Sequence, residues 1–266
     1  MRLSIILLSL SVLLAINCSN SEKPSQKMEL ASKNNPKKDT IKTFKSPYTL
    51  NEVLGKFTPS THIDFVKIDK KHADKSMYLR KAAYEAFIKM HDAAKKDGLS
   101  FIIRSATRNF KRQKQIWEAK WTGARLIGGR NIAKTISDPI ERALKILEFS
   151  SMPGTSRHHW GTDIDLNAFE NSYFEKGKGK KEYDWLLKNA SNFGFCQPYT
   201  KKDRRRPNGY QEEKWHWTYM PISEIFTIQA KLELTNDKIV GFKGSSTAAK
   251  IDVVKNYVLG VNLNCK

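Results

Sequence analysis

The chain has 266 residues and a formal net charge of +20 at pH 7, with 47 Lys and Arg residues against 27 Asp and Glu residues. An apolar run over residues 3 to 16 follows Arg2, and it has the length of a signal-peptide core, which is too short to span a bilayer. The run predicts export, and export together with the lack of any recognised nucleic-acid motif argues against reading the positive charge as a nucleic-acid-binding surface.

The apolar run ends in the letters LAINC at residues 14–18, which resemble a lipoprotein processing site. On this interpretation residues 1–18 are a signal peptide, and Cys18 becomes a lipidated N-terminus that anchors the protein to a membrane. An ordinary secretory signal cleaved nearby is the alternative, and either one places the protein in the periplasm or on the cell surface. Residues 19–46 are rich in Lys, Ser and Asn, so they cannot bury enough surface to offset their ordering entropy. They are predicted to form a flexible tether.

Residues 47–266 are long enough for one domain with a substantial core. Apolar side chains at three- and four-residue steps predict a helix over residues 78 to 97, and Gly98 follows as its stop. Residues 99 to 103 are predicted to form a strand. A second helix is predicted from about Asn109, and a third runs from Asp138 and Pro139 to about Phe149, since Asp is a good cap and Pro a good first helical residue.

Alternation over residues 162 to 166 predicts a strand that places Asp163 and Asp165 on the same face. A helix is expected over residues 182 to 192, and aromatic residues predict a strand over 215 to 219. The Lys- and Arg-rich runs at 176–181 and 201–206 are predicted to be loops. Residues 225–234 and 238–242 fit strand or mixed structure, and 246–259 fit a helix. Long helices with short strands predict an α+β fold.

Two short segments together offer the residue types of a catalytic metal site. The first contains His158 and Asp165, seven positions apart, and the second contains His216 with Glu213 three positions before it. Two imidazoles and one carboxylate are a three-ligand set for catalytic zinc, which leaves a fourth position for water. A glutamate beside that water can act as its general base. Other divalent ions accept the same ligands, although an open three-ligand site next to a Glu favours zinc.

These spacings resemble the zinc D-alanyl-D-alanine carboxypeptidases of the VanY type, whose patterns are Ser-x-His-x-x-Gly-x-x-x-Asp and Glu-x-x-His. The residues that match the two patterns are Ser156, His158, Gly161 and Asp165, then Glu213 and His216 between Trp215 and Trp217. A third match lies upstream, where Ser105, Arg108 and Gln113 resemble the family's Ser-x-x-Arg and the Gln that follows it. The resemblance runs from about residue 78 to 220 and leaves a C-terminal extension after about residue 221 outside it.

The resemblance implies that His158, Asp165 and His216 hold one Zn²⁺ ion per chain. It also implies that Glu213 takes a proton from the zinc-bound water and passes it to the leaving amine. The implied fold is a small antiparallel sheet flanked by helices, of the Hedgehog/DD-peptidase kind.

Three further polar residues are expected to contact the substrate. Arg108 is a candidate to stabilise the oxyanion, because a guanidinium is permanently charged and binds oxygens in a fork. It is equally a candidate to hold the terminal carboxylate of the substrate, and the two roles stay open at this point. Ser156 and Gln113 are expected to supply hydrogen bonds to the substrate backbone.

The expected function is hydrolysis of the terminal D-Ala–D-Ala bond of peptidoglycan stem peptides. Alternatives with the same site are an L,D-carboxypeptidase and an endopeptidase that cleaves cross-links. An alternative of another class is a non-catalytic, zinc-stabilised module that recognises wall peptides. Glu213 counts against this module, because a binder has no need of a general base.

Other residues near the motifs receive separate expectations. His159 is expected to point away from the metal. Asp163 stands where the family commonly has a small apolar residue, and it is a candidate to compete as a ligand, to support a ligand from behind or to bind a substrate amine. In an exported protein Cys196 and Cys265 form either a disulfide or two separate thiols.

Overall fold

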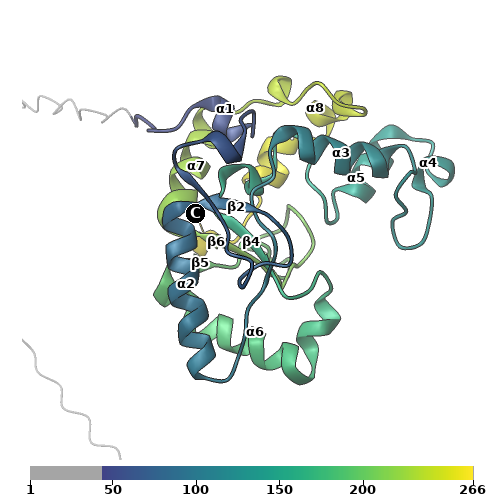
Figure 1. The fold of residues 1–266 in the computed structure, drawn as a ribbon. Coiled ribbons are helices and arrows are strands. Elements are labelled where there is room, and N and C mark those ends of the chain that lie inside the picture. Colours follow the sequence, from purple (N-terminus) through teal and green to yellow (C-terminus); the bar gives the residue numbers. More distant parts are fainter. Residues whose placement is uncertain (1–43, 266) are drawn as a thin grey trace, which may run out of the picture. The chain divides into compact units, whose positions relative to one another are not determined.

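In the computed structural model, which describes residues 44–265, a four-stranded antiparallel sheet lies at the centre of the fold (Figure 1). Its strands, in spatial order, are β3 (Ile103–Ser105), β4 (Asp163–Leu166), β6 (His216–Tyr219) and β5 (Phe195–Cys196). A second, two-stranded sheet pairs β1 (Phe65–Lys67) with β2 (Tyr78–Arg80). The predicted signal peptide with Cys18 and most of the predicted tether lie outside the described residues.

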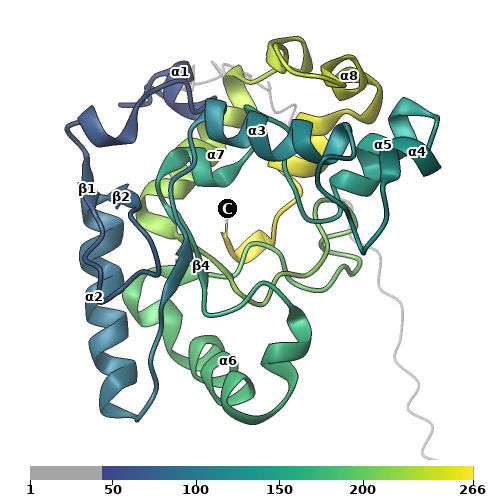
Figure 2. The ribbon, with the colours of Figure 1, turned by 45° about the vertical axis from the view of Figure 1, so that its right-hand side comes forward.

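One face of the central sheet is apolar and the other is polar, because side chains alternate along each strand. Ile164, Leu166 and Trp217 belong to a cluster with the buried faces of α2 (Lys81–Lys96) and α6 (Gly177–Asn189). Figures 1 and 2 both show α2 along one side of the sheet and α6 below it. The intervening strand residues, Asp163 and Asp165 on β4, therefore point to the opposite face.

A second apolar cluster lies beyond this polar face. It joins α3 (Phe110–Trp121), α5 (Pro139–Ile146) and α7 (Met220–Glu233) to the short helices α1 (Leu50–Val53), α4 (Ile132–Thr135) and α8 (Ala248–Ile251). Figure 2 shows α3, α5 and α4 side by side above the sheet. Trp160, which directly follows the first histidine pair, is buried in this cluster and stacks on Phe226 of α7. The polar side chains of the sheet thus lie between two apolar layers.

The C-terminal segment is part of this second cluster. Val253, Val254, Val258 and Val261 are all buried in it. A disulfide between Cys196 and Cys265 joins the segment to the edge strand β5, which confirms the pairing considered from the sequence. The main-chain N–H of Asn262 also donates to the carbonyl of Pro198, at 2.8 Å.

The structure confirms the α+β fold and shifts several predicted boundaries. The helix expected from residue 78 begins at Lys81, because Tyr78–Arg80 pair with β1 instead. The strand expected over 99–103 lies at Ile103–Ser105. The helix expected over 246–259 is α-helical only over Ala248–Ile251, since Asp252 has a left-handed φ of 51°, and a π-helical turn follows at Val254–Val258.

Two predictions of non-helical structure are wrong. Residues 225–233, which were expected to be strand or mixed structure, lie in α7, whose first turn holds Pro221. The apolar run faces the second cluster rather than a neighbouring strand. The Lys-rich run at 176–181 is not a loop, because α6 begins at Gly177. Gly179 fits in this helix because it lies so close to the carbonyl of Tyr173 that a Cβ would meet the carbonyl oxygen at 2.1 Å. Lys178 forms an ion pair with Glu182, one turn later in the helix, at 3.6 Å.

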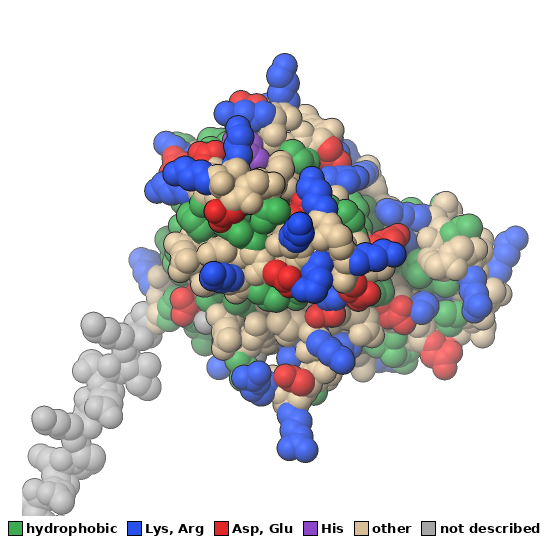
Figure 3. Space-filling view, turned by 90° about the horizontal axis from the view of Figure 1, so that it is seen from below, with side chains coloured by type: hydrophobic (Ala, Val, Ile, Leu, Met, Phe, Trp, Pro, Cys, Tyr) green, Lys and Arg blue, Asp and Glu red, His purple; other side chains and the backbone are tan. Residues whose placement is uncertain are grey.

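Positive and negative side chains are mixed on one face of the molecule. In Figure 3, Lys and Arg side chains are scattered across the face seen from below and are interleaved with Asp and Glu. This distribution is typical of solvated charge. Among the described residues, no helix is both long enough and apolar enough to cross a membrane.

Candidate metal centre

The structure brings His158, Asp165 and His216 together on the polar face of the sheet. One ligand atom of each lies within 4.8 Å of the other two, and all three residues are buried. Asp165 Oδ2 is 3.2 Å from His158 Nε2, and Asp165 Oδ1 is 3.1 Å from His216 Nδ1. Although it is this close, Asp165 Oδ1 has no hydrogen-bond partner. Nitrogen and oxygen atoms of two imidazoles and one carboxylate that converge in this way are what a metal site presents.

Secondary structure explains how residues so distant in sequence meet. Asp165 on β4 and His216 on β6 are directly opposite each other in the antiparallel register. His158 lies one turn before β4, in a 3-10 helix at Arg157–Trp160 that ends at Gly161. Gly161 has a φ of 70°, and a Cβ there would meet the Phe65 ring at 2.3 Å, so the turn into β4 requires glycine.

Hydrogen bonds define which nitrogen of each histidine faces the centre. His158 Nδ1 donates to the carbonyl of Ala106 at 2.8 Å, since a carbonyl only accepts, and this leaves the Nε2 lone pair toward Asp165. His216 Nε2 donates to Asp163 Oδ2 at 2.7 Å, which leaves Nδ1 for the centre. Both imidazoles are therefore oriented as ligands by a partner on the far nitrogen.

Glu213 lies beside this group without belonging to it. Its Oε2 is 3.2 Å from His216 Nδ1, and its backbone is fixed by a bond from its N–H to the carbonyl of Tyr199 at 2.9 Å. The N–H of His216 donates back to the carbonyl of Glu213 at 3.2 Å, so a tight turn places both side chains on the same side.

The pKa shifts follow from burial and from the crowding of carboxylates. Burial raises the pKa of the Glu213 carboxyl above its ordinary value. Burial lowers the pKa of His216, but the carboxylates of Asp163, Asp165 and Glu213 outweigh it and hold this pKa well above the usual range. The site thus has an excess of negative charge around one imidazole, and a divalent cation would offset that excess.

The predicted substrate-contacting residues each have a buried polar atom that makes no hydrogen bond. Arg108 Nε, Gln113 Oε1 and Ser156 Oγ are buried and have no hydrogen-bond partner. Gln113 is held by a bond from its Nε2 to the carbonyl of Ser151, at 2.7 Å, and Arg108 by a bond from its NH1 to Ser105 Oγ, at 3.3 Å. Buried polar atoms are normally satisfied, so these three atoms remain available for further hydrogen bonds.

His159 points away from the centre, as expected. The expected reason was an extended backbone, whereas the segment is a 3-10 helix. Its Nδ1 donates to the carbonyl of Arg108, and its Nε2 accepts from the N–H of Gly154 at 3.0 Å. With both nitrogens used, burial lowers the pKa of His159 to about 3. This histidine supports the backbone of Arg108.

Asp163 lies outside the group of three candidate ligands, and its side chain has no exposed surface. It is fully buried and contacts the outer nitrogen of His216. Two residues that contact it were not singled out from the sequence. Arg157 donates to Asp163 Oδ2. Thr218 lies opposite Asp163 on β6, and its hydroxyl donates to Asp163 Oδ1. Arg157 occupies a variable position of the Ser-x-His pattern, and no spacing rule indicates its partner.

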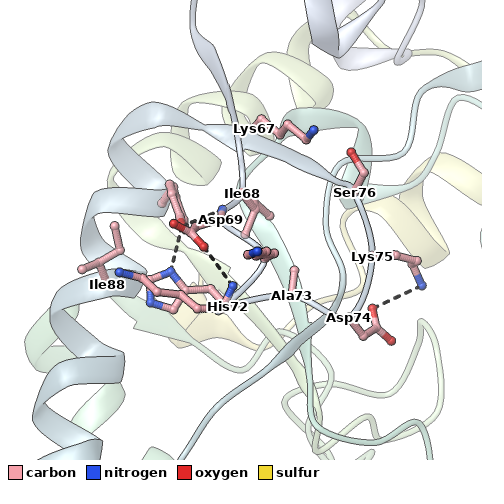
Figure 4. Close-up of a pocket in the computed structure, with 12 residues that line it drawn as sticks. Lys67, Ile68, Asp69, His72, Ala73, Asp74, Lys75, Ser76 and Ile88 are labelled. Atoms are coloured by element: carbon pink, nitrogen blue, oxygen red, sulfur yellow. Dashed lines mark hydrogen bonds and ion pairs between the residues drawn. The ribbon is translucent and has the colours of Figure 1, made fainter.

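Other clusters of the described residues do not resemble this centre. Glu52, His62 and Asp64 also approach one another, but Arg80 lies between the two carboxylates and binds each at 2.7 Å. A cavity of about 900 Å³ lies elsewhere, next to α2 (Figure 4). His72 at its wall is hydrogen-bonded to Tyr84 at 2.7 Å, and none of the residues that line the cavity belongs to the metal group.

Comparisons with known proteins identify the family of this chain. A family model for VanY, D-alanyl-D-alanine carboxypeptidase, matches residues 76–222. The carboxypeptidase-named protein YodJ of Bacillus subtilis is 27% identical over 222 residues, which cover 79% of this chain and 75% of YodJ. A D-alanyl-D-alanine carboxypeptidase of Enterococcus faecalis is 29% identical over 134 residues, which cover 50% of this chain and 45% of that protein.

Among solved structures, VanYB in complex with D-alanine-D-alanine is similar at a TM-score of 0.47 and 23% identity, over 66% of this chain and 87% of that one. The family match spans more than half of the chain and contains every residue of the predicted site. The protein therefore belongs to the VanY family of D-alanyl-D-alanine carboxypeptidases, as its motifs predicted.

Proposed function

We propose that this protein is an exported, zinc-dependent carboxypeptidase that removes the terminal D-alanine from peptidoglycan stem peptides ending in D-Ala–D-Ala. The observation that carries the proposal is the convergence of His158, Asp165 and His216 beside the buried Glu213, in a chain of the VanY family. Two imidazoles and a carboxylate with an open fourth position fit zinc better than calcium or magnesium, which prefer all-oxygen sites.

The metal would supply one part of the chemistry. Zinc bound by these three ligands lowers the pKa of water to about 7 and polarises a carbonyl oxygen. Asp165 Oδ1, a buried oxygen with no hydrogen-bond partner, fits this assignment, because coordination would satisfy it.

Glu213 moves the proton. The attacking water forms a bond from its oxygen to the carbonyl carbon and gives one proton to the Glu213 carboxylate. As the C–N bond breaks, Glu213 delivers this proton to the leaving amino group of D-alanine. Burial raises the pKa of Glu213 above its ordinary value, which favours its acceptance of a proton.

Arg108, Ser156 and Gln113 hold the substrate. The free Nε of Arg108 donates to an oxygen that carries negative charge, either the oxyanion or the terminal carboxylate. Gln113 has only its Oε1 left, so it accepts from a substrate N–H, while the Ser156 hydroxyl either donates or accepts.

Location follows from the N-terminal segment. The apolar run over residues 3–16 and the cysteine that follows it support export with a lipid anchor at Cys18. The disulfide between Cys196 and Cys265 agrees with an oxidising compartment, because such bonds rarely persist in the cytoplasm.

Product analysis with defined muropeptides tests the proposal. The purified, zinc-loaded protein is incubated separately with a pentapeptide that ends in D-Ala–D-Ala and with the tetrapeptide left after that D-alanine is removed. We expect loss of one alanine from the pentapeptide and no change in the tetrapeptide. Cleavage of the tetrapeptide alone would identify an L,D-carboxypeptidase, and binding of either peptide without cleavage would identify a wall-peptide-binding module.

A further inference from the structure

Both carboxylate oxygens of Asp163 accept hydrogen bonds from neighbouring side chains. Its Oδ2 accepts from His216 Nε2 at 2.7 Å, and its Oδ1 accepts from the hydroxyls of Thr162 and Thr218, each at 2.7 Å. The side chain has no exposed surface. Because His216 Nδ1, the opposite nitrogen, faces Asp165 and Glu213, Asp163 acts on the metal centre only through the imidazole between them.

A second buried charge accompanies this carboxylate. Arg157 has no exposed side-chain surface, and its Nε donates to Asp163 Oδ2 at 3.2 Å. Its two terminal nitrogens donate to the hydroxyls of Thr227, at 3.1 Å, and Thr218, at 3.0 Å. A lone buried carboxylate would be strongly destabilising. The guanidinium offsets its charge, so the pair adds a strong acceptor behind His216 without changing the net charge of the centre.

The contact with Asp163 determines which nitrogen of His216 faces the metal centre. A carboxylate only accepts, so the proton of the ring stays on Nε2 and the lone pair stays on Nδ1. Thr218 lies directly opposite Asp163 in the β4–β6 register, which fixes the carboxylate relative to the strand that carries His216. We propose that Asp163, with Arg157 as its counter-charge, is a positioning residue that fixes the tautomer and ring orientation of His216 for the metal.

This inference rests on the proposed zinc site and adds a determinant of its affinity. The competing explanation is that Asp163 and Arg157 form a structural ion pair that only joins the 3-10 turn to the sheet. Removing one charge would strand the other, so both must be changed together to separate the two explanations. The double variant Arg157→Met/Asp163→Ala leaves no unpaired buried charge. Thr227→Val is the matched control, because it removes one bond of Arg157 and leaves the contact between Asp163 and His216 intact.

Zinc affinity and the state of the His216 ring are the two measurements. Affinity is obtained by competition with a chromophoric chelator, and the ring is observed in the ¹⁵N-histidine-labelled, zinc-loaded protein by NMR. We expect about 10- to 100-fold weaker zinc binding in the double variant and about wild-type binding in Thr227→Val. We also expect a downfield, slowly exchanging Nε2–H resonance of His216 in the wild type and in Thr227→Val, and its loss in the double variant.

Each outcome has a defined meaning. Equal zinc affinity and an unchanged Nε2–H resonance in the double variant would overturn the positioning role alone. Absence of zinc from the wild type would overturn the proposed function, and this inference with it. Should the double variant fail to fold, Arg157→Met/Asp163→Asn replaces it, since the amide has the same size as the carboxylate, is a weaker acceptor and leaves no unpaired buried charge. An upfield shift of the Nε2–H resonance in that variant is expected, and no shift would overturn the proposal.

Discussion

Removal of the Cys196–Cys265 disulfide tests how the C-terminal segment stabilises the fold. The bond joins residues separated by 69 positions. In the chain-entropy description, a closed loop of this length restricts the unfolded chain by about 4 kcal/mol at 25 °C. The folded state keeps other contacts of the segment, including the bond from Asn262 N–H to Pro198 and the burial of Val261. We therefore expect the change to act mainly through the unfolded chain.

The assay is urea denaturation of Cys196→Ala/Cys265→Ala and of the wild type, both in chelator so that metal binding does not contribute. The expected result is a free energy of unfolding lower by about 4 kcal/mol in the double variant. Leu263→Ala is the control, since Leu263 is 51% exposed on the same C-terminal turn and its loss should cost little. A decrease below about 1 kcal/mol in the double variant would refute the reasoning, because loop closure predicts several times more.

Three further predictions concern single side chains. Burial lowers the pKa of Lys120 to about 8, so between pH 8 and 10.5 the unfolded chain binds more protons than the folded one and stability rises with pH. Urea denaturation should show that Lys120→Met raises the free energy of unfolding relative to wild type most near pH 7, and that this gain shrinks toward pH 10. A gain that does not change with pH would contradict the lowered pKa of Lys120. Gly161→Ala should lower the free energy of unfolding by about 1 kcal/mol or more beyond the loss in Gly98→Ala. Both glycines have a left-handed φ, but only a Cβ at position 161 would meet Phe65. Equal losses in the two variants would refute the contact. Arg108→Lys should lower kcat about 100-fold on the D-Ala–D-Ala pentapeptide with zinc content unchanged if the guanidinium binds the oxyanion, whereas a rise in KM alone would assign it to the terminal carboxylate.

The ligand group could be read from the sequence because it depends on local periodicity. Strand alternation already places Asp163 and Asp165 on one face, and a Glu-x-x-His turn places Glu213 beside His216. The antiparallel register that places Asp165 opposite His216 cannot be predicted from spacing. The resemblance to the family pattern is what indicated that the two residues meet.

Features that depend on tertiary contacts could not be read in this way. The apolar run at 225–234 has strand-like residues, yet it forms part of α7 because its partners in the second cluster are helices and the C-terminal segment. The role of Asp163 depends on Arg157, whose side chain reaches it only because the 3-10 turn folds back over β4. The spacing of the motifs does not indicate this contact, so the three alternatives for Asp163 stay open on the sequence alone.

The most direct test of the account is a comparison of the wild type with Glu213→Gln, each with its bound zinc measured, on a D-Ala–D-Ala pentapeptide. The amide keeps the size of Glu213 but cannot accept the proton of the attacking water. The account predicts equal zinc content in both proteins, release of one D-alanine by the wild type and no detectable release by the variant. Release of D-alanine by the variant at the wild-type rate would contradict the assignment of Glu213 as the general base of a zinc carboxypeptidase.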